Sequence, residues 1–443
     1  MLSWIKISLM LCFFGFLREI RPSEPFVTDY MIYPWRNITS EMVNRYVFPI
    51  GTYSYAAQLV VVFLITDFLK YKPLIILSGI SGIIVWAILI WTKTLRELQI
   101  TQIFYGTYMA TEVAYYTYIY AKVEKQHYLK VTSHTRAAIL TGKFVASSLG
   151  QILVTTEAMD YRQLNFITFG AQIASAVWAV FLPKVKTSLY FHRNANSNDD
   201  LMNDSADVEK RNANKNRFRE AFRLLWTHFR CAYSNVNILV WSLWYSAAMC
   251  GYLQVISYIQ VLWTEIDNSQ EVIWNGAVEA VITLLGAGVA LLAGYLHSTK
   301  LNQRRSLFAL MFLAACEGSA ILLASSTPHR VVSYVGYLIF CVLYSFTITV
   351  ASAEVAKHLE DDSFGLVFGI NTFVAVLLQT ILTLTVISDE GLALTVFQQY
   401  TVYAVYFFVL SAIYLTAFIF SVVRSCRLKS TKDDPVQLAN GND

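Results

Sequence analysis

The feature that most constrains this chain is a series of long apolar stretches, each long enough to form a helix that crosses a membrane. A spanning helix needs ~20 mostly apolar residues and satisfies its own backbone hydrogen bonds in lipid. Twelve stretches qualify: residues 2–32, 46–69, 74–92, 98–121, 136–156, 164–183, 236–263, 271–296, 305–325, 331–356, 364–388 and 395–424. The pattern predicts an all-α, multi-pass membrane protein with twelve transmembrane helices.

The composition excludes soluble classes of protein. Hydrophobic residues make up 56% of the chain and charged residues 14%, whereas soluble domains carry ~25% charged residues. The net charge of +4 is small and not gathered in one patch, which gives no support for nucleic-acid binding. The six cysteines lie in or near apolar segments, so we expect reduced thiols rather than disulfides. The partner that this composition indicates is the lipid bilayer.

A hydrophilic segment divides the twelve stretches into six and six. Residues 184–235 are rich in Asn, Asp and Lys, which predicts a linker that is disordered at its start and closes with a surface helix over 218–229. We therefore expect a six-helix bundle at 1–183, a second at 236–424 and a tail at 425–443. This plan is typical of major facilitator transporters, whose halves enclose a central site.

The distribution of basic residues predicts the orientation. If the N-terminus is cytosolic and the sides alternate, most lysines and arginines fall on the cytosolic side, as the positive-inside rule requires. Both termini and the linker are then cytosolic. The same arrangement places the sequon that begins at Asn37 outside, where a glycan is expected, and the sequon at Asn203 inside, where none is expected.

Ionisable residues inside spanning helices are costly unless they face a cavity or a partner, so each is a candidate site residue. Glu24 follows Pro22 and precedes Pro25, and such a break in a helix either lines a transport site or forms a kink near the outer surface. The full set is Glu24, Glu112, Lys143, Glu279, Glu317 and Glu354. For Glu317 and Glu354 we predict only interhelical pairing.

Glu112 lies in a tyrosine-rich stretch, FYGTYMATEVAYYTYIY. At ~100° per residue it shares one sector of the helix with several tyrosines. A carboxylate among phenol rings suits a flat, cationic aromatic ligand, whereas the tyrosines alone also fit ordinary helix packing. The candidate ligand-binding residues in this sector are Tyr105, Tyr108, Glu112, Tyr115 and Tyr116.

Two further polar groups lie on helix faces. Asn275 and Glu279 are four residues apart and share a face, which fits either ligand binding or a polar clamp between the two halves. Lys143 shares a face with Ser147 and Gln151. Because an unpaired buried ammonium is costly, we expect Lys143 to pair with a buried glutamate, Glu112 in first place, and contact with an anionic ligand is the alternative.

The sequence gives little support for an enzymatic function. Gly79-Ile80-Ser81-Gly82 is similar to a short motif of intramembrane serine proteases, but all histidines fall in loops or at helix ends, so the serine has no base nearby. No G-x-x-x-x-G-K-[ST] motif occurs, so ATP-driven transport is unsupported. We predict no catalytic residue, no metal site and no cofactor.

Five segments together resemble the reduced folate and thiamine carrier family. They are CFFGFLREIRPSEPFVTDY, TYSYAAQLVVVFLITDFLKYKP, FYGTYMATEVAYYTYIY, WNGAVEA and GLVFGINTF. The resemblance implies a major facilitator fold, a plasma-membrane location and ATP-independent uptake of a small-molecule B vitamin by alternating access, secondary-active or facilitative. A transporter-like receptor that binds without moving its ligand is the alternative from another class.

The resemblance also bears on which vitamin is carried. Folate carriers have basic residues where this chain has Glu112, Cys341 and Gln379. The residues that instead match the site of thiamine transporters are Glu24, Phe48, Glu112, Tyr115 and Asn275. Two positions depart from the thiamine pattern: Gly51 replaces a tryptophan and Lys143 replaces a tyrosine. Thiamine is the leading substrate, and a reduced folate or another organic anion is the alternative.

Overall fold

The structure is a computed structural model, and it describes residues 3–32, 35–185, 223, 226–227, 229–231, 233–266, 273–300, 303–357, 359 and 364–433. Throughout these residues the chain is helical, with short connections and no strand. The predicted linker at 184–235 and its surface helix at 218–229 lie largely outside the described residues. The predicted tail at 425–443 begins inside the last helix, which continues to Asp433.

The helices fall into two sets along the chain. The first set is α1 (Ser3–Glu19), η1 (Glu24–Phe26), α2 (Val27–Met31), α3 (Ser40–Met42), η2 (Val43–Val47), α4 (Phe48–Phe68), α5 (Lys72–Trp91), α6 (Leu95–Ala110), α7 (Glu112–Lys122), η3 (Lys125–His127), α8 (Tyr128–Thr155) and α9 (Tyr161–Phe181). The second set is α11 (Val236–Ile266), α12 (Asn275–Lys300), α13 (Gln303–Ser325), α14 (Arg330–Ala356), α15 (Phe364–Val386) and α16 (Val396–Asp433).

The predicted spans correspond to these helices with two differences. Within the described residues, ten helices are long and apolar enough to cross a membrane. The other two predicted spans, 2–32 and 98–121, are each broken, the first into α1, η1 and α2 and the second into α6 and α7. The span predicted from residue 46 is helical from Ser40, because its first turns carry polar side chains that a search for apolar stretches passes over.

Each set packs around its own apolar core. One cluster of buried side chains comes entirely from residues 238–414, and two others come almost entirely from residues 7–185. The outward faces carry large exposed apolar side chains such as Leu291 and Phe420, as expected of surfaces that contact lipid. The all-α membrane fold is therefore confirmed. The five cysteines whose side chains are described are free thiols in the structure.

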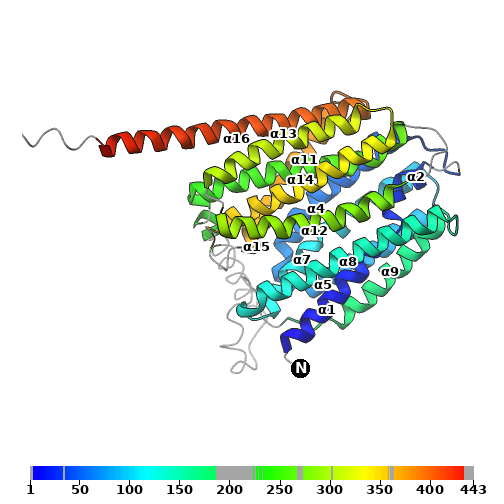
Figure 1. Ribbon diagram of the computed structural model, residues 1–443. Coiled ribbons are helices and arrows are strands. Elements are labelled where there is room, and N and C mark those ends of the chain that lie inside the picture. The colour runs from blue at the N-terminus through cyan, green and yellow to red at the C-terminus, as the bar shows by residue number, and fades with distance from the viewer. Residues whose placement is uncertain are drawn as a thin grey trace, which may run out of the picture.

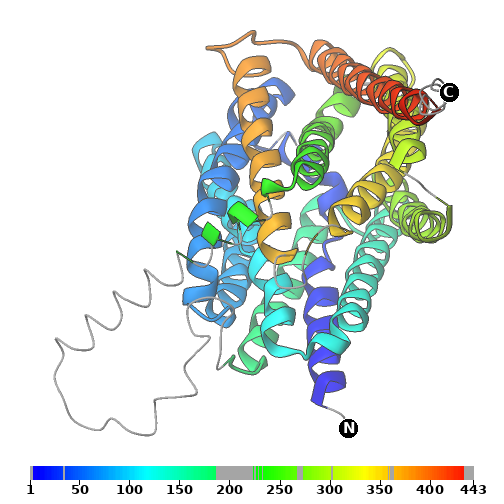
Figure 2. The same cartoon turned by 90° about the vertical axis from the view of Figure 1, so that its left-hand side faces the viewer.

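The two sets form two halves that meet along α8 with α12 and α4 with α15. In Figure 1 the helices α11 to α16 lie together above α1, α5, α8 and α9, and α12 borders α8. In the same view the ribbons of the two halves lie close together near α2 and are separated at the opposite end, toward the N-terminus of α1 and the C-terminal end of α16. The view in Figure 2 shows the same separation, with α1 (blue) and α16 (red) on opposite sides of the molecule.

The break after α1 has a local cause in its sequence. Pro22 and Pro25 supply no backbone donor, and the residue before a proline disfavours helical geometry, so α1 ends at Glu19. Between α6 and α7, the Thr111 hydroxyl donates to the carbonyls of Thr107 and Tyr108. This back-bonding to the preceding turn bends helices. Thr117 and Thr135 make the same pair of bonds inside continuous helices, so these bonds accompany the break, after which Glu112 begins a new helix, but do not by themselves cause it.

Candidate functional site

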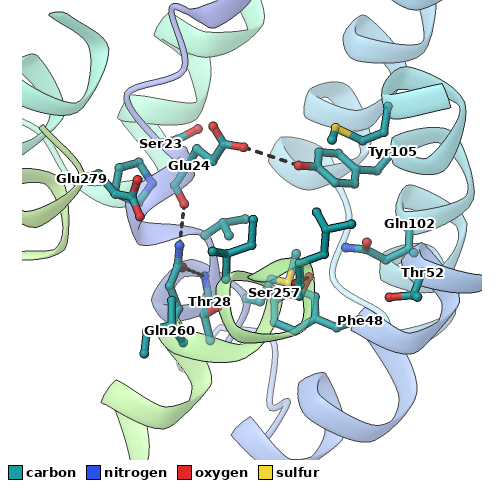
Figure 3. Close-up of a pocket in the computed structure, with 18 of the residues that line it drawn as sticks. Ser23, Glu24, Thr28, Phe48, Thr52, Gln102, Tyr105, Ser257, Gln260 and Glu279 are labelled. Atoms are coloured by element: carbon teal, nitrogen blue, oxygen red, sulfur yellow. Dashed lines mark hydrogen bonds between the residues drawn. The ribbon is translucent and has the colours of Figure 1, made fainter. Parts of the chain in front are cut away.

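A cavity of about 270 Å³ lies between the two halves, beside the break that separates α1 from α2. Figure 3 shows Glu24 between Glu279 on one side and Tyr105 on the other, with Gln102 and Thr52 beyond Tyr105. The polar and aromatic side chains in its wall include Ser23, Glu24, Phe48, Thr52, Tyr55, Gln102, Tyr105, Lys143, Tyr252, Gln260, Glu279, Tyr337 and Gln379. Both halves therefore contribute to one site.

Glu24 is placed in the wall by the helix break. Its Oε1 accepts a hydrogen bond from Arg21 Nη1 at 2.8 Å and one from the Tyr105 hydroxyl at 3.4 Å. The Gln260 amide of the second half donates to the Glu24 carbonyl at 3.0 Å, and its oxygen accepts from the Thr28 backbone. The break therefore leaves backbone groups free for partners from the other half, as the interpretation of a transport site requires.

A buried charge network lies behind Glu24. Arg21 Nη2 is 2.6 Å from Glu19 Oε2, and Arg18 Nη1 is 3.6 Å from Glu19 and 3.3 Å from Glu112. Only 4% of the Arg18 side chain is exposed, so its charge must be neutralised by these neighbours. The network holds one more carboxylate than cation, since Arg18 and Arg21 face Glu19, Glu24 and Glu112.

Glu112 lies outside the cavity wall, contrary to the sequence interpretation that placed it against the ligand. Its carboxylate pairs with Arg18, and Tyr108 and Tyr115 are buried against α1. The Tyr108 hydroxyl donates to the Arg18 carbonyl at 3.2 Å and the Tyr115 hydroxyl to the Leu11 carbonyl at 2.8 Å. Because α1 covers these rings, Tyr105 is the member of the predicted tyrosine sector that lines the cavity.

Lys143 pairs with a glutamate as predicted, but the partner differs. Its Nζ is 3.3 Å from Glu279 Oε2 across the boundary between α8 and α12, so the expected pair with Glu112 is wrong. The other oxygen of Glu279 accepts from the Tyr337 hydroxyl at 3.2 Å. Partner choice depends on which helices are neighbours, and α12 rather than α7 lies against this part of α8.

Of the two residues on this face of α12, Glu279 fits the interpretation of ligand binding and Asn275 fits that of a polar clamp. Glu279 lines the cavity, whereas Asn275 is buried and clamps the halves together. The Asn275 amide donates to the Pro25 carbonyl at 3.0 Å and to Asp29 at 3.2 Å, and its oxygen accepts from Tyr334 at 2.7 Å. Phe48, also predicted, lines the cavity.

The remaining glutamates contact residues of the second half. Glu317 on α13 accepts from the Thr347 hydroxyl on α14 at 2.8 Å, which is the interhelical pairing expected. Glu354 contacts Lys357 at 3.2 Å, three residues along the same chain segment.

The search for ionisable residues missed neutral amides in the wall. Gln102 and Gln260 both line the cavity. Their signal is a polar side chain inside an apolar stretch, which is weaker than that of a charge. Gln102 also occupies the space beside Gly51 where a larger side chain would begin. The missing tryptophan is therefore replaced in part by an amide from α6.

Comparisons with known proteins identify the family. The sequence profile described as "Reduced folate carrier" matches residues 2–402. Thiamine transporter 1 of Mus musculus is 37% identical over 98% of this chain and 92% of its own length. Folate transporter 1 of Caenorhabditis elegans is 36% identical over 95% and 93%, and the reduced folate transporter of Homo sapiens 34% over 96% and 74%.

Solved structures confirm the fold. The nucleoside transporter NupG superposes with a TM-score of 0.62 at 14% identity, over 93% of this chain and 99% of its own. A bacterial homologue of the human lysosomal transporter Spinster gives a TM-score of 0.62 at 12% identity, over 94% and 98%. The major facilitator fold predicted from the six-plus-six plan is therefore confirmed. The family profile and the relatives at 34–37% identity, which are transporters, show that the protein is a membrane transporter rather than an enzyme. The chain belongs to the reduced folate carrier family.

Proposed function

We propose that this chain carries thiamine, or a closely related flat aromatic cation, across the plasma membrane by alternating access. The observation that carries this proposal is the charge of the cavity. The charged side chains in its wall are Glu24, Glu279 and Lys143, two carboxylates against one ammonium. Adding the network behind Glu24 brings in Arg18, Arg21, Glu19 and Glu112 and leaves the same excess of one negative charge. A single positive charge on the ligand completes this balance.

The rings in the wall support an aromatic ligand. Tyr105 comes from the first half and Tyr252 and Tyr337 from the second, so aromatic surfaces face the cavity from both sides. A cation near such rings is attracted by their negative faces. The volume of about 270 Å³ lies near the small end of ligand pockets, ~300–1,000 Å³, which suits a vitamin of two small rings.

Several features disfavour a reduced folate with two carboxylates. Cys341 and Gln379, which align with basic residues of folate carriers, are neutral, and Cys341 is buried in the core of the second half. The folate alternative is favoured by Lys143, an ammonium in the cavity wall, and by the similarity to the folate transporter of C. elegans. Because Lys143 is already paired with Glu279, we rank the cation first.

The orientation proposed from the distribution of lysines and arginines tells which end of the structure faces the outside of the cell. The end at which the halves converge carries Asn37, which is exposed, and the Arg45–Asp389 ion pair at 2.9 Å. With both termini cytosolic, this end faces outward and the divergent end faces the cytosol. The structure then corresponds to a carrier that is closed to the outside.

Uptake measurements in cells test the proposal. Cells that express the chain are compared with control cells for uptake of radiolabelled thiamine and of a radiolabelled reduced folate. Thiamine uptake above the control, competed by unlabelled thiamine and not by the folate, is expected. Folate uptake without thiamine uptake would overturn the substrate. Surface binding of thiamine without accumulation would favour the receptor alternative.

A further inference from the structure

The ion pair between Lys143 and Glu279 joins the two halves inside the cavity. Lys143 belongs to α8 of the first half and Glu279 to α12 of the second, and both line the cavity wall. Tyr337 holds the other carboxylate oxygen of Glu279 from α14. The carboxylate is therefore fixed by its own half, while the ammonium reaches it from the opposite half.

This pair is accessible from the cavity. The Lys143 side chain is 38% exposed and that of Glu279 is 17% exposed. Ion pairs in contact with water are weak, because solvent screens the charges and competes for both partners. A ligand cation that enters the cavity can therefore exchange with the ammonium on Glu279. The other charged group in the wall, Glu24, is negative, and Tyr252 is neutral, so this part of the cavity favours a cation over an anion.

We infer that Lys143 is an internal competitor of the cationic substrate, since its ammonium neutralises Glu279 in the empty carrier and is displaced when the substrate binds. The inference rests on the proposed function and assigns Lys143 a role in selectivity and in the transport cycle. Displacement removes a link between α8 and α12. Substrate binding at Glu279 is thereby coupled to the contact between the halves.

The role predicts a specific kinetic pattern. After releasing its substrate, the empty carrier must return with its site closed to both sides. Without Lys143 the site would close around the unpaired carboxylate of Glu279, which is unfavourable. Lys143→Gln should therefore slow the return of the empty carrier while leaving the loaded carrier able to move. Net uptake into thiamine-depleted cells should fall about threefold to tenfold, and the half-saturating thiamine concentration should fall by a similar factor, since the competitor is gone. Exchange of external for internal thiamine should persist.

Three variants serve as controls. Lys143→Arg keeps the positive charge and should retain net uptake. The reversed pair, Lys143→Glu with Glu279→Lys, keeps an ion pair between the halves and should restore part of the net uptake that Lys143→Gln loses. Lys357→Gln removes an ammonium that is 3.2 Å from Glu354, a neighbour on the same segment rather than in the other half. Lys357→Gln should change neither the net uptake nor the half-saturating thiamine concentration.

A second measurement reports on the halves without any substrate. Ser40 Oγ and Thr264 Oγ1 lie 3.2 Å apart across the boundary at the converging end. The Ser40→Cys/Thr264→Cys variant should form a disulfide on oxidation, and neither single variant should form that link. Adding Lys143→Gln should slow this cross-link about twofold to threefold, a loss typical of a weak ion pair, and the reversed pair should restore it.

The outcomes separate this inference from the proposed function. Normal net uptake and unchanged half-saturation in Lys143→Gln, or loss of net uptake in Lys143→Arg equal to that in Lys143→Gln, would overturn the competitor role. If the wild-type chain takes up no thiamine, the proposed substrate fails. In that case a slower cross-link in Lys143→Gln still supports the link between the halves, whereas an unchanged cross-link overturns it.

Discussion

At the scale of single residues, Glu24 is the carboxylate that we expect to set substrate charge. It lies in the cavity wall, held by Arg21 and Tyr105. Unit charges ~4 Å apart attract by about 4 kcal/mol at an effective dielectric of 20, of which only part survives desolvation. Glu24→Gln should weaken thiamine uptake about tenfold, with normal surface expression, and Glu24→Asp should do less harm. Normal thiamine uptake by Glu24→Gln would remove this residue from the site.

Glu112 should act through a different route. Its carboxylate neutralises the buried Arg18, so Glu112→Gln leaves that guanidinium short of a partner at a cost of about 1–3 kcal/mol. We expect a lower thermal stability and less protein at the surface, with a half-saturating concentration near that of the wild type. Arg18→Gln combined with Glu112→Gln should recover part of the lost stability. A changed half-saturating concentration at normal stability would instead place Glu112 in contact with the substrate.

The sequence identified the ionisable residues of the site but only some of their neighbours. Glu24, Lys143 and Glu279 stand out as charges in apolar stretches, and all three line the cavity. The partner of Lys143 and the burial of Tyr108 could not be read from one chain, because they depend on α12 lying beside α8 and on α1 covering α6. Periodicity places side chains on one face of a helix and does not say what packs against that face.

At the scale of helices, the crossing of α8 and α12 depends on a glycine. A Cβ added to Gly276 would lie 2.8 Å from the Ser147 carbonyl oxygen, which belongs to the backbone of α8 and cannot swing away. Small residues permit such close approach in membrane proteins. Gly276→Ala should therefore separate the two helices, lower the thermal stability and reduce transport severalfold.

Gly288, on the same helix, provides the matched control. A Cβ added there would meet nothing within 4 Å. Gly288→Ala should leave both stability and uptake near the wild-type values. Equal effects of the two substitutions would mean that the close approach to α8 is not responsible, since the change from Gly to Ala by itself favours a helix.

The helix breaks show what local sequence predicts about elements. Pro22 and Pro25 predict the interruption after α1, and in the structure η1 and α2 follow it. No proline or glycine marks the break at Thr111, and threonine occurs inside the continuous helices α7 and α8 as well, as Thr117 and Thr135 show. The break after α1 could therefore be predicted from the sequence, whereas the break at Thr111 could not.

At the scale of the whole molecule, glycosylation tests the proposed direction. Asn37 is exposed, with a backbone φ of 54°. Asn37→Gln should remove a glycan and increase electrophoretic mobility, as enzymatic deglycosylation of the wild type would. Asn203→Gln should leave the mobility unchanged. A glycan lost only in Asn203→Gln would reverse the orientation of the carrier.

The contact at the converging end gives a prediction for pH. Hydrogen bonds from the Tyr46 hydroxyl and from Arg45 lower the pKa of Asp389 below its usual range. A depressed pKa means that this contact is fully present above the ordinary value of ~3.9 and is lost only as the pH falls through the lowered one. Once oxidation has gone to completion, the Ser40→Cys/Thr264→Cys cross-link should therefore reach the same extent at an external pH of about 5.5 and about 7.5, although it forms more slowly at the lower pH because fewer thiols are ionised. Loss of the cross-link at the lower value would contradict this role of Asp389.

The most direct test of the cation assignment is transport by the purified chain alone. Vesicles that contain only this protein are compared with empty vesicles for accumulation of thiamine and of a reduced folate, which removes every endogenous carrier and separates movement from binding. The charge of the cavity predicts that thiamine accumulates, that the folate does not, and that Glu24→Gln reduces the thiamine rate about tenfold. Accumulation of the folate without thiamine would contradict the assignment.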